Sequence, residues 1–391
     1  MFKTVSNFVS VRARLGLCLL LLFPVPGALQ AEVLLMPVPD EGVQPRLVQD
    51  AEGGVHLLYF KKRINRPAAR EGNLYYRQYD AEAGRFGSPV RVSSQAFNMM
   101  TFALARAAMA VGGDGRIHVM WYLPGESAFF YSRSNPERSQ FEPQQSMVTE
   151  FVEGIDAGGD VAAFGEQVAI VWGAGDLSRE HERSMYARFS SDSGASFGEE
   201  IMIANPDLGA CACCSMAMAY DSEDLLYLAY RSAIDGIGRH MQLLSVTGFT
   251  AQSMASNYLP LQPLQQWEAS FCPLSTNDME LNVGDRNLLV FETESRIVVM
   301  DIDEPASLRQ AGEPHTETRQ RNPALAINQH GEHLVVWGEA ISNSRGGRLN
   351  LRLFDAEGEV TGYRLAEEVQ IRDYSFPAAA SLPNGDFLVL Y

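Results

Sequence analysis

The chain has 391 residues with 48 acidic and 31 basic side chains, which gives a formal net charge of −17. This acidic balance argues against nucleic acids and anionic membranes as partners, because both need a basic footprint on the protein. The length allows two ordinary domains or one large repeat domain.

Residues 1–31 have the composition of a secretory signal peptide. Three basic side chains precede an apolar stretch at residues 15–23, which is too short to span a bilayer. A segment with Pro, Gly and Ala then leads to an expected cut after Ala31, and Cys18 would leave with the peptide. No later stretch is long and apolar enough for a transmembrane helix. We therefore expect an exported protein, periplasmic or secreted, without a transmembrane segment.

One pattern recurs along the rest of the chain: a short alternating apolar run, a polar turn, and a second run that ends in aromatic residues. Its seven copies begin near residues 45, 105, 160, 215, 279, 323 and 377. A spacing of roughly 45–65 residues is typical of the four-stranded blades of a β-propeller. Helical periodicity is nearly absent, so the pattern predicts an all-β protein.

The segments between the copies supply the remaining strands of each blade. Residues 73–80 and 88–94, for example, fit the third and fourth strands of the first blade. We predict one β-propeller of residues 32–391 with six or seven blades, seven being favoured. The last copy stops at Tyr391 after two strands, so residues 32–38 are expected to complete that sheet. Two sandwich domains are the alternative, although sandwiches rarely repeat so evenly.

The segment SSDSGASFG resembles the Asp-box of the sialidase (neuraminidase) superfamily of propellers. The matching positions follow the spacing Ser-x-Asp-x-Gly-x-Ser-Phe and are Ser190, Asp192, Gly194, Ser196 and Phe197. In such a turn the carboxylate accepts backbone N–H groups, glycine takes a positive φ and the aromatic ring packs between blades. The resemblance implies a sialidase-like propeller and a structural role for these five residues.

Four cysteines remain after the signal peptide, and three of them crowd into one short segment as Cys211, Cys213 and Cys214. In an oxidising compartment an even count suggests disulfides. If the segment is extended, Cys211 and Cys213 lie roughly 6.6 Å apart at two strand rises, the outer edge of disulfide geometry. A bridge from either of them to Cys272 is easier, and a vicinal Cys213–Cys214 bridge would be strained.

A soft-metal site is the other interpretation of the same cysteines. Thiolates from Cys211 and Cys213, joined by Cys214 and Cys272, would suit copper(I) or zinc. Auxiliary ligand candidates nearby in the sequence are Met216, Met218 and His240. The two methionines alternate as core residues of a strand do, and the histidine fits the surface. The sequence leaves the disulfide and the metal open.

The cysteine spacing also resembles a subgroup of exported sialidase-like propellers, which pair a Cys-x-Cys-Cys element with a later Trp…Cys-Pro element. The matching residues of the second element are Trp267, Cys272 and Pro273. This resemblance implies the propeller fold and the grouping of the four cysteines. Both cysteine segments lead into inner strands of neighbouring blades, which converge on the axis, so we expect the four cysteines to form one cluster near the propeller axis.

Sialidase activity itself would need three arginines around the substrate carboxylate and a Tyr nucleophile activated by a Glu. Arg46, Arg106, Arg321 and Arg372 stand near the starts of inner strands, and the closing segment resembles that of the superfamily, which would make Tyr374 the nucleophile. The expected Arg-Ile-Pro is replaced by PRLV, and the chain ends where a Glu would follow. We therefore expect a binding or assembly propeller for a soluble protein or glycan, with an exo-sialidase as the alternative.

Overall fold

The computed structural model describes residues 31–63, 70–99, 105–124, 126–156, 158–259, 265–312, 318–342 and 344–391. The predicted signal peptide lies outside these residues apart from Ala31. The unit Glu32–Tyr391 consists of β-strands with four short 3-10 helices in its described part, and none of the helices found there is of a length and hydrophobicity to span a bilayer. The 3-10 helices are η1 (Pro39–Glu41), η3 (Glu180–Glu182), η4 (Pro206–Leu208) and η5 (Pro305–Ser307).

The strands form seven sheets, numbered here as blades 1 to 7 in chain order. From the axis outward, blades 1 to 4 contain β2 (Val43–Gln49), β3 (Val55–Lys62), β4 (Glu71–Asp80) with β5 (Arg85–Phe86), β6 (Val90–Arg91) and β7 (Phe97–Asn98); β8 (Ala108–Val111), β9 (Ile117–Leu123), β10 (Ala128–Arg133) and β11 (Gln145–Ser146); β12 (Gly159–Phe164), β13 (Gln167–Ala174), β14 (Ser184–Ser190) and β15 (Ile201–Met202); and β16 (Ala217–Tyr220), β17 (Leu226–Arg231), β18 (Met241–Thr247) and β19 (Ala255–Tyr258). Blades 5 to 7 contain β20 (Asn277–Val283), β21 (Arg286–Thr293), β22 (Arg296–Asp301) and β23 (Arg309–Gln310); β24 (Gln320–Ile327), β25 (His333–Glu339) and β26 (Arg348–Phe354); and β27 (Ala378–Ser381), β28 (Phe387–Leu390) and β1 (Val33–Met36).

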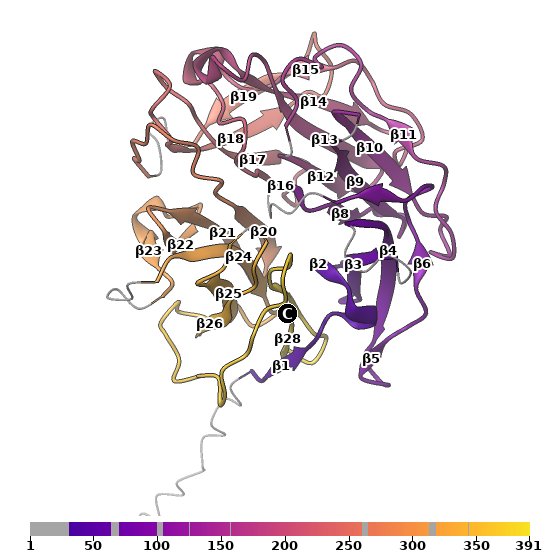
Figure 1. Ribbon diagram of the computed structural model, residues 1–391, viewed down its shortest axis with the longest axis vertical. Coiled ribbons are helices and arrows are strands. Elements are labelled where there is room, and N and C mark those ends of the chain that lie inside the picture. The colour runs from indigo at the N-terminus through magenta and orange to yellow at the C-terminus, as the bar shows by residue number, and fades with distance from the viewer. Residues whose placement is uncertain are drawn as a thin grey trace, which may run out of the picture. The chain divides into compact units, whose positions relative to one another are not determined.

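The innermost strand of each blade contacts the innermost strands of the two neighbouring blades, so the seven sheets form a closed ring around an axis (Figure 1). The ring is closed by β1, which pairs in parallel with β28 from Val33 opposite Phe387 to Met36 opposite Leu390. The predictions of an all-β propeller, of seven blades, and of a last sheet completed by the N-terminal strand are therefore confirmed.

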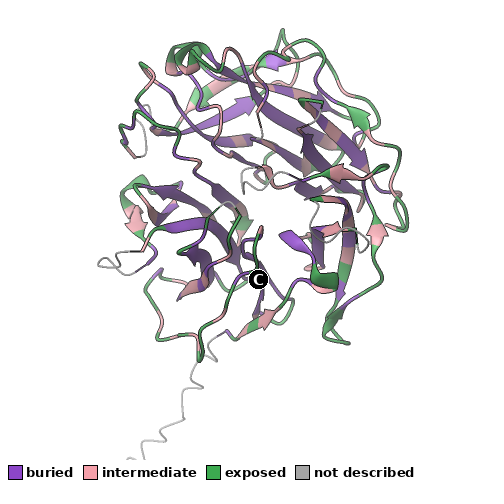
Figure 2. Cartoon of the chain, viewed as in Figure 1, coloured by how far each residue is buried: buried purple, intermediate pink, exposed green. Residues whose placement is uncertain are grey.

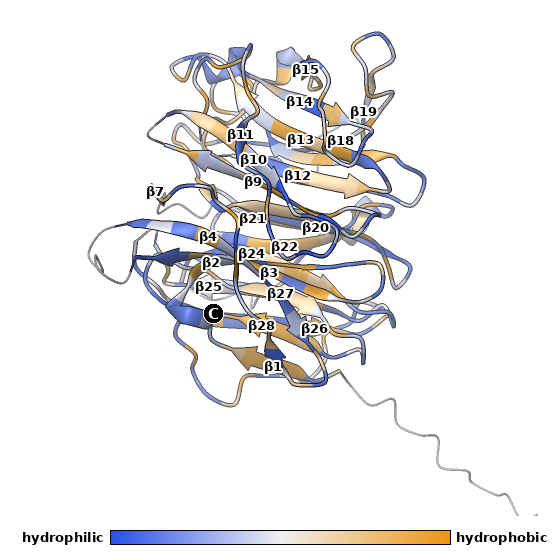
Figure 3. Ribbon diagram, turned by 90° about the vertical axis from the view of Figure 1, so that its right-hand side faces the viewer, coloured by the Kyte–Doolittle hydropathy of each residue, from blue (hydrophilic) through white to orange (hydrophobic). Residues whose placement is uncertain are grey.

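The core lies between the blades. Each described hydrophobic cluster joins the facing sheets of two neighbours, as where Val171 and Met185 of blade 3 pack with Leu228 and Leu244 of blade 4. The second strand of a blade is covered on both faces, and all seven residues of β9 are buried. This explains why the second run of each repeat is almost continuously apolar, since a strand covered on both faces needs no polar side. Figure 2 shows buried strands with exposed connections, and Figure 3 shows the matching hydropathy.

The turn between β14 and β15 has the hydrogen bonds expected of an Asp-box. Asp192 accepts from the backbone N–H and the hydroxyl of Ser196 at 2.9 and 2.6 Å, and the hydroxyl of Ser190 donates to it at 2.7 Å. Gly194 has a φ of +75°. Phe197 packs edge-on against Tyr131 of β10, with ring centroids 5.0 Å apart. The turn therefore joins blade 3 to blade 2.

Candidate functional site: a cysteine cluster between two blades

Four of the five cysteines lie just before two neighbouring inner strands. Cys211, Cys213 and Cys214 precede β16 of blade 4, and Cys272 precedes β20 of blade 5. The first segment is not extended as the spacing argument assumed, because Ala212 and Cys213 form a turn. The N–H of Cys211 donates to the carbonyl of Arg231 at 2.9 Å, which holds this turn against the end of β17.

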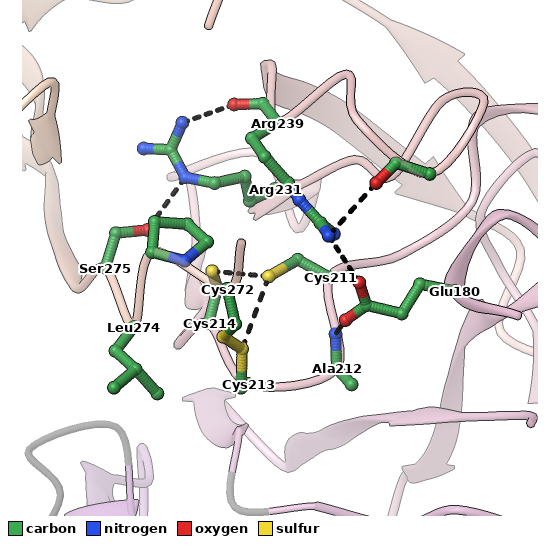
Figure 4. Close-up of a disulfide and its surroundings, with 12 residues drawn as sticks. Glu180, Cys211, Ala212, Cys213, Cys214, Arg231, Arg239, Cys272, Leu274 and Ser275 are labelled. Atoms are coloured by element: carbon green, nitrogen blue, oxygen red, sulfur yellow. Dashed lines mark hydrogen bonds and ion pairs between the residues drawn. A yellow bond between two sulfur atoms is a disulfide. The ribbon is translucent and has the colours of Figure 1, made fainter. Parts of the chain in front are cut away.

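The four sulfur atoms form one group (Figure 4). Cys213 and Cys272 form a disulfide with a Cα–Cα distance of 6.6 Å and a sequence separation of 59. The Sγ of Cys211 lies 3.7 Å from that of Cys213 and 2.6 Å from that of Cys214. A disulfide with the sequence separation of Cys213 and Cys272 stabilises the fold by about 4 kcal/mol, because it lowers the entropy of the unfolded chain. The disulfide thus ties blade 4 to blade 5 and leaves a Cys-x-x-Cys pair beside it.

The members of the group differ in exposure. Cys211 and Cys214 are each 3% exposed and carry free thiols. Cys272 is exposed at the surface and Cys213 is half-buried. The disulfide therefore separates the buried thiol pair from solvent.

Arg231 supplies a buried positive charge to the group. It is 1% exposed and donates to neutral oxygens, namely the hydroxyl of Ser275 at 2.7 Å, the carbonyl of Arg239 at 2.6 Å and the carbonyl of Glu292. Burial alone would raise the pKa of Cys214, but a hydrogen bond from Cys211 and the charge of Arg231 lower this pKa to about 7. Burial and the hydrogen bond to Cys214 raise the pKa of Cys211 well above its ordinary value. Cys214 is therefore the more acidic thiol of the pair.

Two further buried arginines add to the positive charge. Arg239 pairs with Glu180, whose other carboxylate oxygen accepts from the N–H of Ala212 at 2.9 Å. Arg183 donates to the carbonyls of Gly154 and Gly175. Both guanidinium groups keep two buried nitrogens without a hydrogen-bond partner among the described residues. The three arginines carry more positive charge than Glu180 can neutralise, and this surplus favours the thiolate form of the nearby cysteines.

The segment that carries Cys272 is held by blade 6. Arg319 and Arg321 donate to the carbonyls of Pro273 and Leu274, each at 3.0 Å. The carboxylate of Glu292, fully buried, lies 2.8 Å from Arg319 and 3.8 Å from Arg321. These contacts fix the outer cysteine relative to the turn of the other three.

The auxiliary ligand candidates have other roles. Met216 and Met218 belong to the hydrophobic cluster between blades 3 and 4. The Nδ1 of His240 accepts from the N–H of Trp267 at 3.0 Å. In the described part of the chain, the group of potential metal ligands that stands out is Cys211, Cys213 and Cys214, whose sulfurs all lie within 4.8 Å of one another.

The residues that a sialidase would use are engaged with different partners. Arg46 forms an ion pair with Asp278 at 2.9 Å, whereas Arg321 is next to Glu292. Arg372 is exposed before β27, and Arg106 stacks on Phe376 with 5.3 Å between the guanidinium carbon and the ring centroid. The half-buried ring of Tyr374 lies under the ammonium group of Lys62 at 4.4 Å.

The sequence did not reveal a set of carboxyl groups at the axis. Asp160, Asp278 and Glu280 each accept from an N–H of the next blade, at 2.8, 3.1 and 2.9 Å. Burial raises the pKa of Asp160 to about 6 and that of Glu280 to about 8. Asp278, Glu280 and Arg46 also line a cavity of about 1040 Å³ that extends along the inner strands to their far ends. Acidic residues at inward positions of predicted inner strands were the signal that could have found them.

None of the four cysteines lines this axial cavity. They lie at the opposite ends of the inner strands and extend outward to the end of β17. The expectation that the cysteines group together agrees with the structure, but the group is placed between two blades and not around the axis.

Comparison with known proteins places the fold only. No family profile matches the chain, and no curated protein matches its sequence. A crystal structure of a protein of unknown function from Dyadobacter fermentans matches with a TM-score of 0.50 and 11% identity, over 82% of this chain and 96% of that one. The α-L-arabinanase of Penicillium chrysogenum matches with a TM-score of 0.46 and 10% identity, over 83% of this chain and 96% of that one. The NanB sialidase of Streptococcus pneumoniae matches with a TM-score of 0.48 and 8% identity, over 88% of this chain and 70% of that one.

Proposed function

We propose that this protein is an exported, sialidase-like propeller that acts as a binding module, and that its cysteine cluster holds a soft metal ion. The observation that carries the proposal is the free thiol pair of Cys211 and Cys214, whose sulfur atoms lie 2.6 Å apart beside buried guanidinium groups. Thiolates select copper(I) or zinc over harder cations. A metal bound by several thiolates keeps a net negative charge, which the surplus of arginine would offset.

The redox state of the Cys213–Cys272 disulfide determines how many thiols are free and therefore which metal ion the cluster can bind. With Cys213 and Cys272 joined, the available thiols are Cys211 and Cys214, a pair that suits copper(I), which accepts few sulfur ligands. A closed zinc site needs four ligands, so zinc requires reduction of the disulfide. The proposed resident ion under oxidising conditions is therefore copper(I).

A binding role fits the axial arginines better than hydrolysis does. Arg46 and Arg321 are already neutralised by Asp278 and Glu292. A substrate carboxylate would have to compete with these ion pairs. The partner we propose is a soluble protein or a glycan, since the acidic chain repels polyanions.

The test is metal stoichiometry in the mature protein, residues 32–391. Copper(I) is supplied without oxygen from a competing chelator, and native mass spectrometry counts the ions bound to the oxidised and the fully reduced forms. We expect one copper in the oxidised form, lost in Cys211→Ser and in Cys214→Ser, and zinc only in the reduced form. Met216→Leu, a buried change in the next strand, is the matched control and keeps the copper. Copper binding that survives both serine variants would refute the site.

A further inference from the structure

The structure places a disulfide at the surface and a free thiol pair directly behind it. We propose that these four cysteines carry out thiol–disulfide exchange, which passes an electron pair from Cys211 and Cys214 through Cys213 and Cys272 to an accessible disulfide of another protein. This activity goes beyond metal binding, although it uses the same cysteines.

The distances define the order of the steps. The Sγ of Cys211 lies 3.7 Å from Cys213, so it is placed to attack the disulfide. The Sγ of Cys214 lies 2.6 Å from that of Cys211 and is placed to take its proton and later to attack it, which displaces Cys213. Cys272, the exposed member, is the sulfur that leaves.

The exchange within the chain balances without an outside reagent. With Cys214 as a thiolate at the start, Cys211 gives its proton to Cys214 and attacks Cys213; the Cys211–Cys213 bond forms, the Cys213–Cys272 bond breaks, and Cys272 leaves as a thiolate. The proton then passes from Cys214 to Cys272. Cys214, again a thiolate, attacks Cys211; the Cys211–Cys214 bond forms, the Cys211–Cys213 bond breaks, and Cys213 leaves as a thiolate. One disulfide and two thiol equivalents are present before and after.

The external step transfers the electron pair. Cys272 attacks the disulfide of the partner and forms a mixed disulfide, which Cys213 resolves by attacking Cys272. The partner leaves as a dithiol, having gained two electrons from the chain, one proton from Cys272 and one proton from solvent, and the chain keeps two disulfides. The partner is oxidant in this step, so no other co-reactant is needed.

The surface beside Cys272 suits a protein partner. Phe271, its neighbour in the chain, is 59% exposed and packs edge-on against Trp267. Ile237 is 45% exposed, and its carbonyl accepts from Ala269 of the same segment at 2.9 Å. Apolar side chains next to the reactive sulfur can hold an unfolded or apolar segment that carries a disulfide.

The test uses metal-free mature protein that holds one disulfide, alkylated without denaturant and mapped by peptide mass spectrometry. In Cys214→Ser the proton of Cys211 goes to an alkaline buffer, so the first step still occurs and the second cannot; Cys211–Cys213 is therefore trapped and Cys272 is alkylated. In Cys211→Ser the attacking sulfur is missing, and Cys272 stays protected in its disulfide. The wild type reduces a small aromatic disulfide reagent stoichiometrically and gains a Cys211–Cys214 bond, and Cys211→Ser loses this reaction.

Near-ultraviolet circular dichroism checks that both serine variants keep the wild-type fold. Protection of Cys272 in folded Cys214→Ser, or labelling of Cys272 in Cys211→Ser, would overturn the exchange. Because the exchange is measured without metal, it fails or succeeds independently of copper binding. A protein that binds copper and leaves Cys272 protected refutes the exchange alone.

Discussion

At the scale of single residues, the buried arginines beside the cysteines are the main feature of the site that the sequence did not predict. Arg231 lies within a shell of neutral acceptors next to Cys214, and Arg183 and Arg239 keep unpartnered nitrogens nearby. A charge removed from water is costly unless something compensates it. Arg239 pairs with Glu180, and the thiols of Cys211 and Cys214 lie close to Arg231, which links the arginines to the chemistry of the thiols.

Glu280 gives a prediction about pH. Its folded pKa is about 8, raised by burial from 4.5, so the folded protein holds a proton that the unfolded chain releases. The stabilising contribution is complete below pH 4.5 and is lost as the pH rises through about 8. Glu280→Gln keeps an acceptor for the N–H of Ile327 and removes the titration. As the pH is raised from 4.5 to about 8, we expect the urea midpoint of the wild type to decrease relative to that of the variant.

Glu199, which is exposed, provides the control for this measurement. Glu199→Gln should leave the pH dependence of the wild type unchanged. Parallel curves for the wild type and Glu280→Gln would show that Glu280 titrates in the folded protein as it does in the unfolded chain.

The cysteines could be found from the sequence because they are rare and crowded, whereas the arginines could not. Arginine in a strand is exposed more often than buried. Only the packing of the blades places Arg231 beside the thiols and Arg321 against the segment that carries Cys272. The pairing of Cys213, and not Cys211, with Cys272 also depends on a local turn. The distance expected from the sequence had taken that segment as extended.

At the scale of elements, the alternating apolar runs predicted strands well because each one is a local pattern. Blade number and closure followed from counting copies, and β1 joining β28 followed from a last copy that was two strands long. The carboxyl groups of Asp160 and Asp278 bond to the strand of the next blade, a contact that no single repeat contains. Sequence patterns define each blade, and the contacts between blades position the site.

The turn between β14 and β15 offers a prediction at this scale. Asp192→Ala removes the acceptor for Ser190 and for both donors of Ser196, and we expect a loss of about 1–2 kcal/mol in the free energy of unfolding. Chemical denaturation measures it. Asp192→Asn keeps one acceptor oxygen and should lose less, while the exposed Glu199→Ala should stay within about 0.5 kcal/mol of the wild type. If Asp192→Ala leaves the free energy of unfolding unchanged, the turn is held by its backbone and by Phe197 alone.

At the scale of the whole molecule, the ring depends on one parallel strand pair. Strand β1 covers the outer edge of β28, and the flanking bonds include Phe387 N–H to the carbonyl of Glu32 at 2.8 Å and Val38 N–H to the carbonyl of Tyr391 at 3.2 Å. Each backbone hydrogen bond contributes about 0.5–1.5 kcal/mol net, so the pairing of β1 with β28 stabilises the fold by several kcal/mol. The pairing also makes the stability of blade 7 depend on residues 33–36.

The final prediction compares chains that begin at residue 32 and at residue 39. Without β1, the edge of β28 is open, and we expect a thermal midpoint several degrees lower and self-association through that edge. Differential scanning calorimetry and light scattering of both chains check this. The chain from residue 32 with Leu34→Ala is the control, since Leu34 is 42% exposed and its backbone pairing is kept. Equal midpoints for the two lengths would mean that blade 7 is stable as β27 and β28 alone, and that the seven-bladed ring does not require its closing strand.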